Sequence, residues 1–353
     1  MNYLFFLVHP SKFHVFRSTI NILKEKGHNV DILITSKDVL EPLVKSEGWS
    51  YTNIFQEGRK IKSIHPYFGA IINTLRTIYR LIKFIGNKKY DKFITDDLLV
   101  IVGKLKGVPS FLFQDDDLEV VPETGLLMLF TDYILSPSCS DMGRFNYKKL
   151  NFNSYKELGG LHPKRFNPNP KKIEEYIDIK KRFFTIRLVS LKAVHDWGKR
   201  GLSDAELKII ARFLENYGQV VICSERALPK YLEKYKISLA PQHMPHLLYY
   251  SSAFIGDSQT MCAESGVLGT PFIRYNDFVG KISYLSEIED EYKLGFGVEV
   301  GDTKRLVSLI KYLIKSDNVE DLWTRRRERM LEEKVDLTDF LLSKLEDNKL
   351  IMK

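Results

Sequence analysis

"FIGDSQTMCAESGVLGTPFI", residues 254–273, contains the pattern that decides the fold of this chain. An apolar run ends at Gly256 and Asp257, small and polar residues follow, and a second apolar run begins after Pro271. The pattern predicts a strand, a helix and a strand in direct succession, which is the repeating unit of parallel β-structure. The helix carries one acid, Glu264, among small and apolar neighbours, so a binding role for this acid has to be considered.

The same alternation runs through the rest of the chain. In the first half we expect strands at residues 3–8, 29–35, 90–97, 109–117 and 131–138. In the second half we expect strands at residues 182–190, 219–224, 253–258 and 271–276. Amphipathic helices are expected between them, the first over about residues 14–26 and another after the S-x-x-E capping box of Ser203 and Glu206. The alternation predicts the α/β class, with parallel sheets covered by helices on both faces.

Length and composition indicate a two-domain globular protein. The chain has 353 residues, more than one ordinary core, and 44% of them are hydrophobic. Segment 161–181, rich in Pro, Asn and Lys, interrupts the alternation and is the expected interdomain linker. Three cysteines without CxxC spacing favour a reducing compartment. No uncharged stretch reaches the ~18 residues of a spanning helix, and the apolar start looks like a buried strand, so a cytoplasmic location is expected.

The turn from strand to helix at Ser258 has the features of a phosphate site. Backbone N–H groups at a helix N-terminus have no intrahelical partner, and the helix dipole favours negative charge there. Ser258, Gln259 and Thr260 are small or flexible, so a phosphate can approach the backbone closely. Glu264 follows about a turn later and can accept hydrogen bonds from a ribose diol. The alternative is an ordinary turn in which Ser258 is the N-cap and Glu264 lies on a solvated face.

The segment from Asp257 to Ser265 resembles the donor-site segment of GT-B-type proteins in the UDP-N-acetylglucosamine 2-epimerase-like group. The shared pattern is Asp257-Ser258, two small residues, three variable residues and then Glu264 with a small residue. The resemblance implies that the serine and the amides after it hold a diphosphate and that the glutamate holds the ribose. This chain has Gln259 and Thr260 where that group usually has two glycines.

A closer resemblance is to the family called domain of unknown function 354, which groups predicted glycosyltransferases of undefined substrate. It covers most of residues 1–330 and is carried by "LVHPSKFHVFRSTINILKEKGHNV", "PSFLFQDDDLE", "YKELGGLHPKRFNPNP", "FTIRLVSLKAVHDWGKRGLS" and "IGDSQTMCAESGVLGTP". It implies a GT-B fold, in which two Rossmann-like domains with parallel sheets face a central cleft. The implied parts are an acceptor domain (1–165), a linker (166–181), a nucleotide-sugar domain (182–325) and a C-terminal helix (326–353) that crosses back to the first domain.

Four side chains are candidates for catalysis. His14 is expected to open the first helix after a Pro-Ser-Lys turn, and an imidazole there can serve as general base or as a helix cap. His9 lies nearer the strand and is expected to be packed. Asp97 and Asp117 belong to two acidic strand ends, 96–97 and 115–117, and resemble carboxylates of the epimerase-like cleft, although capping and plain solvation are the alternatives. His195 follows the strand at 182–190, where epimerase-like proteins have a functional histidine.

Other candidates concern binding. Lys199 and Arg200, close to His195, can pair with phosphate oxygens. His243 and Met244 are candidate contacts to the nucleotide base, because the corresponding GT-B loop often touches it. His243 and His246 have the spacing of a zinc pair but lack further ligands, so no metal is expected.

The net charge of +8 suits an anionic substrate or a membrane surface, or reflects a lysine-rich proteome. Basic residues flank an apolar stripe in segment 74–92, which is typical of a helix that lies on an anionic membrane or of an ordinary solvated surface helix; they are Arg76, Arg80, Lys83, Lys88 and Lys89. No aromatic and basic alternation indicates nucleic-acid binding.

These features lead to three functional hypotheses. The first is a glycosyltransferase that moves a sugar from a nucleotide-sugar to a hydroxyl of a saccharide or lipid-linked acceptor, in surface polysaccharide or glycolipid assembly. It needs no cofactor beyond its nucleotide-sugar substrate, and it can lie peripherally on the inner face of the membrane. The second is an NDP-sugar 2-epimerase. The third is a non-catalytic protein that binds a nucleotide or a sugar.

Overall fold

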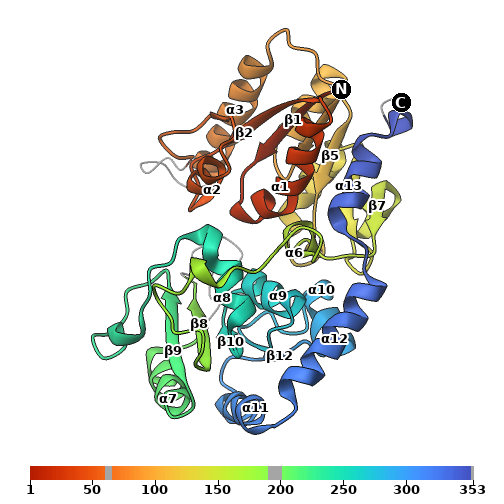
Figure 1. Cartoon of the computed structure of the whole chain (residues 1–353). Coiled ribbons are helices and arrows are strands. Elements are labelled where there is room, and N and C mark those ends of the chain that lie inside the picture. Colours follow the sequence, from red (N-terminus) through yellow and green to blue (C-terminus); the bar gives the residue numbers. More distant parts are fainter. Residues whose placement is uncertain (60–65, 190–200, 351–353) are drawn as a thin grey trace. The chain divides into compact units, whose positions relative to one another are not determined.

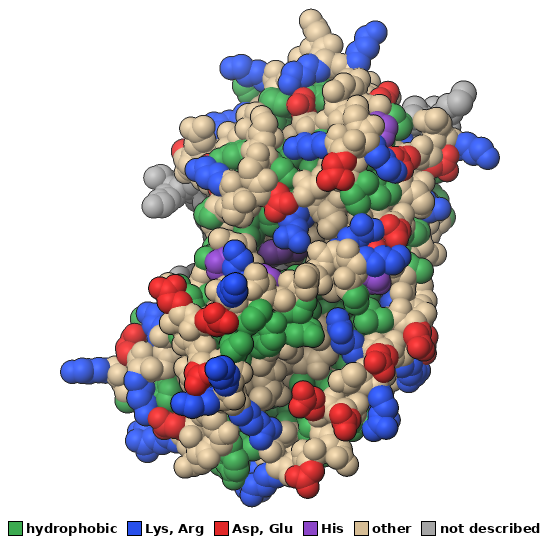
Figure 2. All heavy atoms as spheres, in the orientation of Figure 1, with side chains coloured by type: hydrophobic (Ala, Val, Ile, Leu, Met, Phe, Trp, Pro, Cys, Tyr) green, Lys and Arg blue, Asp and Glu red, His purple; other side chains and the backbone are tan. Residues whose placement is uncertain are grey.

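The computed structural model describes residues 1–59, 66–189 and 201–350, and it divides the chain into two compact units (Figure 1). Unit 1 consists of Met1–Gly160 and Val335–Lys353, and unit 2 of Leu161–Lys334. Unit 1 contains a seven-stranded sheet and unit 2 a five-stranded sheet, and every strand pairing is parallel. The predicted α/β class is confirmed. Cationic and anionic side chains are interspersed over the face drawn in Figure 2.

The sheet of unit 1 has the strand order β3-β2-β1-β4-β5-β6-β7. Its strands are β1 (Asn2–Leu7), β2 (Asn29–Ile34), β3 (Thr52–Asn53), β4 (Lys92–Thr95), β5 (Ser110–Phe113), β6 (Tyr133–Pro137) and β7 (Lys149–Phe152). In register, Phe6 pairs with Leu33 on one side and with Thr95 on the other. The chain leaves β1 toward β2 and later returns to its other side as β4, so the order reverses between β1 and β4. Ligands of open α/β sheets bind beyond the carboxyl ends of the strands at such a point.

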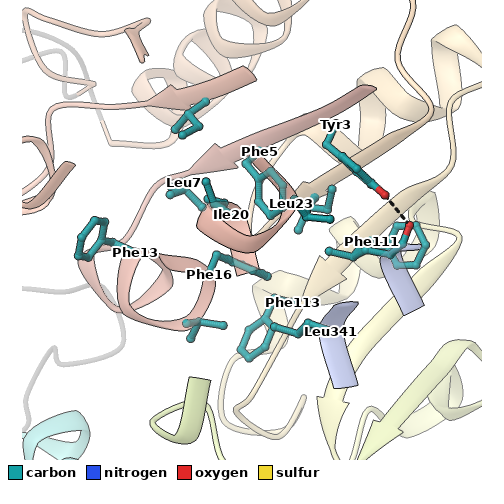
Figure 3. Packing of buried hydrophobic residues seen from close by; sticks show 14 of the residues in the cluster. Tyr3, Phe5, Leu7, Phe13, Phe16, Ile20, Leu23, Phe111, Phe113 and Leu341 are labelled. Atoms are coloured by element: carbon teal, nitrogen blue, oxygen red, sulfur yellow. Dashed lines mark hydrogen bonds between the residues drawn. The ribbon is translucent and has the colours of Figure 1, made fainter. Parts of the chain in front are cut away.

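Helices cover both faces of this sheet. They are α1 (Pro10–Glu25), α2 (Leu40–Ser46), α3 (Pro66–Ile85), α4 (Leu99–Lys106), α5 (Gly125–Phe130), α6 (Leu158–Leu161) and α13 (Leu337–Leu345), with 3₁₀ turns η1 (Pro122–Thr124), η2 (Gly143–Lys148) and η8 (Asn348–Leu350). On one face α1, α2 and α13 bury alternate residues of β1, among them Phe5 and Leu7, and on the other α3 and α4 bury Leu4 and Phe6. Figure 3 shows the first cluster, where the Tyr3 hydroxyl donates to the carbonyl of Leu345 at 3.0 Å.

The start of α1 differs from the sequence-based expectation. The helix begins at Pro10 and not near His14, because the fixed φ of proline suits a first helical position, where its missing N–H is not needed. His9 is the N-cap, and its Nδ1 accepts from the N–H of Ser11 at 3.2 Å. The expectations of a packed His9 and of a turn before His14 were therefore wrong: His9 is exposed, and His14 lies in the second turn of α1.

The sheet of unit 2 has the order β12-β11-β10-β8-β9. Its strands are β8 (Phe183–Leu188), β9 (Gln219–Ser224), β10 (Ala253–Gly256), β11 (Phe272–Tyr275) and β12 (Gly295–Val298). Its helices are α7 (Asp204–Leu214), α8 (Met244–Tyr250), α9 (Gln259–Leu268), α10 (Ser283–Ser286), α11 (Thr303–Lys315) and α12 (Val319–Glu333), with short turns η3 (Pro170–Lys172), η5 (Glu233–Tyr235) and η6 (Pro241–His243) and the π-helical η7 (Glu287–Glu291). The predicted capping box is confirmed: Ser203 Oγ accepts from the N–H of Glu206, whose carboxylate accepts from the N–H of Ser203.

Two of the domain limits expected from the sequence can be compared with the limits of the two units. Residues 166–181, expected as a linker, belong to unit 2. Within the C-terminal part, α12 belongs to unit 2 and α13 to unit 1. The contacts of α13 with α1 make the end of the chain part of the first unit's core.

Candidate functional site

The first turn of α9 is the polar end of an otherwise buried helix. Strand β10 ends at Gly256, and Ser258 is the N-cap of α9, with its Oγ accepting from the N–H of Met261 at 3.3 Å. Ser258, Gln259 and Thr260 are partly exposed, whereas residues 261–268 are all buried. Since the first N–H groups of a helix have no intrahelical partner, the exposed first turn is a place where an anion can bind.

Asp257 anchors this turn from within. Its side chain is buried, and its Oδ1 accepts from the N–H of Val189 at 2.8 Å. A Cβ atom on Gly201 would lie 2.4 Å from Asp257 Oδ2, so only glycine allows the chain before α7 to pass so close. Burial raises the pKa of Asp257 to about 6, and the hydrogen bond from the N–H of Val189 opposes this rise. Asp257 therefore holds the turn in place.

Glu264 lies in the second turn of α9 and is only 8% exposed. The alternative that it lies on a solvated face was therefore wrong. A buried carboxylate is costly unless hydrogen bonds or charges compensate it, so an acid at this position needs polar partners in the folded chain or in a ligand. Along the axis it lies about 9 Å beyond Ser258 at 1.5 Å per residue.

A buried ion pair supports the same turn from the neighbouring strand. Arg274 in β11 is fully buried, and its Nε and Nη2 donate to the two oxygens of Glu289 at 2.6 and 2.8 Å. Its Nη1 donates to Oδ1 of Asn276 at 3.1 Å, and Nδ2 of Asn276 donates to the carbonyl of Asp257 at 3.1 Å. This network was not predicted from the sequence, although an arginine inside the apolar run "PFIRY" is a visible signal.

The second candidate region is the carboxyl edge of the unit 1 sheet, where the strand order reverses. Asp96 and Asp97 follow β4 there. Asp97 forms a bidentate ion pair with Arg59, with N–O distances of 2.7 and 2.9 Å. Asp96 Oδ1 accepts from the N–H of Val8 at 3.2 Å. Burial raises the pKa of Asp96 to about 6; the Lys12 ammonium opposes this rise and the Asp97 carboxylate adds to it.

A buried group of charged side chains lies beside this edge. Asp115, after β5, accepts from Lys12 Nζ at 2.7 Å and from Lys156 Nζ at 2.5 Å. The two ammonium groups outweigh burial and hold the pKa of Asp115 well below its usual range. Glu157 is buried as well, and neither of its carboxyl oxygens has a hydrogen-bond partner within the described part of the chain. Lys156 Nζ lies 3.8 Å from Oε1 of Glu157.

The pKa of Glu157 makes it a group that titrates near neutrality. Burial raises this pKa to about 7, with Asp115 adding to the rise and Lys156 and Lys12 opposing it. Lys12, Lys156 and Glu157 were not predicted as site residues, because nothing in the sequence places Lys12 next to Lys156. The only signal was the pair of charges in "SYKELGG", which interrupts an otherwise small and aromatic segment.

Glu157 is expected to contribute a stability that falls as the pH rises from 4.5 through 7, and Glu157→Gln is expected to remove this contribution. The folded state holds the Glu157 proton more tightly than the unfolded state does. The contribution of this proton to the free energy of unfolding is therefore complete below pH 4.5, the unfolded pKa, and it is lost as the pH rises to about 7, the folded pKa. The shift corresponds to about 3 kcal/mol. Asp96 and Asp257 act in the same direction, whereas His9 and His14, whose pKa values are lowered by desolvation, act in the opposite one, so the quantity to compare is the difference in slope between the variant and the unaltered chain. Urea unfolding at pH 5 to 8 measures it, and an identical slope in both proteins would contradict the shift.

The remaining candidates lie in different places. Burial lowers the pKa of His14 to about 4, helped by Arg17, so its imidazole is neutral but only weakly basic at pH 7. Asp117 is buried, and its Oδ1 accepts from the N–H of Asp141 at 2.8 Å.

In unit 2, His243 is the N-cap of α8 and Met244 its first residue. Three further candidates, His195, Lys199 and Arg200, lie outside the described residues. In the described ranges no group of three or more His, Cys, Asp or Glu side chains has the arrangement of a metal site.

Comparison with known proteins identifies the fold. Neither the models of known protein families nor the sequences of curated proteins give a match, so the resemblance to the domain of unknown function 354 family stays a prediction. Solved structures do match. A putative UDP-N-acetylglucosamine 2-epimerase from Listeria monocytogenes aligns over 98% of this chain and 96% of its own, with a TM-score of 0.69 and 9% identity.

The spinosyn rhamnosyltransferase SpnG complexed with thymidine diphosphate aligns over 98% of this chain and 100% of its own (TM-score 0.66, 13% identity). The calicheamicin glycosyltransferase CalG4 aligns over 98% of both chains (TM-score 0.60, 11% identity). The fold is of the GT-B type. At these identities the similarity shows the fold alone, and glycosyltransferases and epimerases match it equally well.

Proposed function

We propose that the chain is a GT-B glycosyltransferase that moves a sugar from a nucleotide-sugar donor to a hydroxyl of a saccharide or lipid-linked acceptor. One observation carries the proposal: the partly exposed first turn of α9 is followed, about 9 Å along the axis, by the buried acid Glu264. In this proposal the amides and side chains of Ser258, Gln259 and Thr260 hold the diphosphate. Glu264 accepts hydrogen bonds from the ribose hydroxyls, and His243 and Met244 contact the base.

The chemistry follows from these roles. The acceptor hydroxyl attacks the anomeric carbon, the bond from this carbon to the diphosphate oxygen breaks, and the electron pair leaves with the diphosphate. The positive end of the α9 dipole stabilises the charge that develops on the leaving group. Lys199 and Arg200 are proposed to add positive charge to it, and His195 to act beside them.

A base must take the proton of the acceptor hydroxyl, and the candidates are His14, Asp97, Asp117 and Asp96. The first three are weak candidates, because His14 has a pKa of about 4, Asp97 is paired with Arg59, and Asp117 is buried in a hydrogen bond. Asp96 combines a place at the strand-order reversal with a pKa raised to about 6. We therefore favour Asp96, since a base works best when its pKa lies near the working pH.

One observation favours a second function, an NDP-sugar 2-epimerase. An epimerase removes and returns a proton, so it needs carboxyl groups that change protonation near neutrality. Asp96 and Glu157 have raised pKa values of about 6 and about 7, and both lie near the carboxyl edge of the unit 1 sheet. Several of the solved structures that share the fold are UDP-N-acetylglucosamine 2-epimerases.

Thermal unfolding in the presence of nucleotides tests the donor site. We expect UDP or TDP at about 100 times its Kd to stabilise the chain by about 2.7 kcal/mol, which raises the melting temperature by roughly 5 to 10 °C. The nucleosides without phosphate should have little effect, because the α9 amides then bind nothing. If no nucleoside diphosphate raises the melting temperature, the donor site is disproved.

Incubation with nucleotide-sugars separates the two activities. A transferase releases nucleoside diphosphate at catalytic rates only when a sugar or glycolipid acceptor is added. An epimerase forms the 2-epimer without an acceptor. Product analysis by NMR distinguishes the two outcomes, and binding without turnover of any donor and acceptor pair supports a non-catalytic binder.

A further inference from the structure

Helix α3 carries large apolar side chains on its outer side as well as on its inner side. Inside, Leu81 and Ile85 belong to the core of unit 1. Outside, four large apolar side chains are more than half exposed: Phe68 (65%), Ile71 (57%), Leu75 (63%) and Tyr79 (65%). A surface helix normally turns polar side chains outward, so the outer side of α3 has the character of a buried face.

These four residues form one continuous stripe. Their spacings of three and four residues place them on the same side of the helix, one above the other. At 1.5 Å per residue the stripe is about 16 Å long. None of the described helices has the length and apolar character of a membrane span, and α3 already packs one side on the sheet. The stripe is therefore suited to contact a surface, not to cross one.

The exposed charged side chains of α3, of α4 and of the segments that follow them have one sign. Between Phe68 and Leu118 every exposed charged side chain is a lysine: Lys83, Lys88, Lys89, Lys104 and Lys106. The C-terminal ends of α3 and α4 lie side by side, since Lys106 Nζ donates to the carbonyl of Gly86 at 3.4 Å. A further apolar side chain, Leu105, is 66% exposed between two of these lysines.

The neighbouring carboxylates do not neutralise this group. Glu57 is paired with Arg76 and Arg80, both of which also stack on Phe55. From sequence these two arginines were among the basic residues beside the apolar stripe. In the structure their guanidinium groups contact Glu57 and Phe55, which precede α3.

On the other flank, Asp31 accepts from Lys88 and from the hydroxyl of Tyr90. Lys83, Lys89 and Lys104 have no carboxylate partner in the described part of the chain.

A second copy of the chain fits this face poorly. In a two-fold dimer each surface meets the same surface of its partner, so the lysines of one copy would lie against those of the other. Like charges at such a distance repel, and the carboxylates beside this face, Glu57 and Asp31, are already paired with its own arginines and with Lys88. A negatively charged apolar surface fits it well, and a bilayer with anionic headgroups has both properties.

We propose that the outer side of α3, together with the lysines at the ends of α3 and α4, binds the surface of a bilayer that contains anionic lipids. The four apolar side chains enter the boundary between headgroups and acyl chains, and the lysines lie at the level of the lipid phosphates. The proposal goes beyond the transferase function and does not depend on it, because a chain without any enzymatic activity would still bind.

Co-sedimentation of the full chain with vesicles tests the proposal. We expect binding to vesicles of roughly three parts phosphatidylcholine and one part phosphatidylglycerol to be at least about tenfold tighter than to pure phosphatidylcholine. Raising NaCl to about 1 M, where the Debye length falls to about 3 Å, should weaken it. No preference for the anionic vesicles would overturn the proposal, and neither result depends on nucleotide binding.

Two variants and two matched controls locate the surface. We expect Leu75→Ser with Tyr79→Ser, and separately Lys83→Glu with Lys104→Glu, each to weaken vesicle binding about tenfold or more. The controls lie in unit 2: Ile209→Ser on α7, where the side chain is 56% exposed, and Lys311→Glu with Lys315→Glu on α11. Both controls should bind as the unaltered chain does.

Two further readouts complete the test. Melting temperatures should be unchanged in all four proteins, because the replaced side chains are exposed. Equal binding by the α3 variants and the controls would overturn the proposal. Sedimentation equilibrium tests whether a second copy of the chain covers the stripe instead. If the unaltered chain is a dimer and the variant Leu75→Ser with Tyr79→Ser is a monomer, a second copy covers the stripe, and the proposal is overturned.

Discussion

Replacing Glu264 with alanine is expected to weaken the binding of a nucleoside diphosphate by about 100-fold, which is the largest functional effect that we expect of a single substitution. The carboxylate is proposed to accept from both ribose hydroxyls, and a hydrogen bond to a charged group contributes about 1.5 to 3 kcal/mol. Two such bonds at the lower value amount to about 3 kcal/mol, or roughly two orders of magnitude in Kd. Titration calorimetry with UDP measures the effect; with thymidine diphosphate, whose deoxyribose offers one of the two hydroxyls, the expected loss is about tenfold.

Two further variants separate a lost contact from a damaged helix. Glu264→Gln keeps the volume and one acceptor oxygen but removes the charge, so we expect a loss of about tenfold. Ser265→Ala is the matched control, because Ser265 is the next residue of α9 and its buried hydroxyl has no hydrogen-bond partner among the described residues. Its affinity should be that of the unaltered chain. An unchanged Kd in Glu264→Ala, with the melting temperature preserved, would remove the ribose role.

The α/β class and most strands could be predicted from sequence because their signals are local. Strand β10 and helix α9 have an apolar run, a capping serine and Gly269 in the left-handed conformation, all within the segment that folds. The strand β12 was missed for an equally local reason. Its sequence GFGV contains two glycines, which usually indicate a loop. Gly295 is required there because a Cβ would lie 2.3 Å from the ring of Phe272.

The candidate site could be predicted only where it is contiguous in sequence. The stretch from Ser258 to Glu264 was visible, whereas the group of Lys12, Asp115 and Lys156 depends on three segments that only the folded sheet brings together. The acidic strand end at 115–117 was visible in the sequence, but the pairing of one of its carboxylates with two distant lysines was not. Asp117 was favoured from resemblance, while Asp115 is the residue between the two lysines.

Replacing Arg274 with methionine is expected to lower the free energy of unfolding by about 3 to 5 kcal/mol, which is the typical cost of leaving one partner of a buried ion pair alone. Arg274 is fully buried, and without it the Glu289 carboxylate keeps its burial but loses both hydrogen bonds. Urea unfolding followed by circular dichroism measures the loss. The matched control is Arg329→Met, which removes an exposed arginine paired with Glu291 and Glu333 and should leave stability essentially unchanged.

The double variant Arg274→Met with Glu289→Leu separates stability from positioning. Because no unpaired charge remains, most of the lost stability should return. The hydrogen bond from Arg274 to Asn276 stays absent, so Asn276 holds the carbonyl of Asp257, and with it the start of α9, less firmly. We therefore expect nucleotide affinity to remain about 3- to 10-fold weaker, the effect of one lost hydrogen bond. Full recovery of both properties would show that the network stabilises unit 2 without positioning the phosphate site.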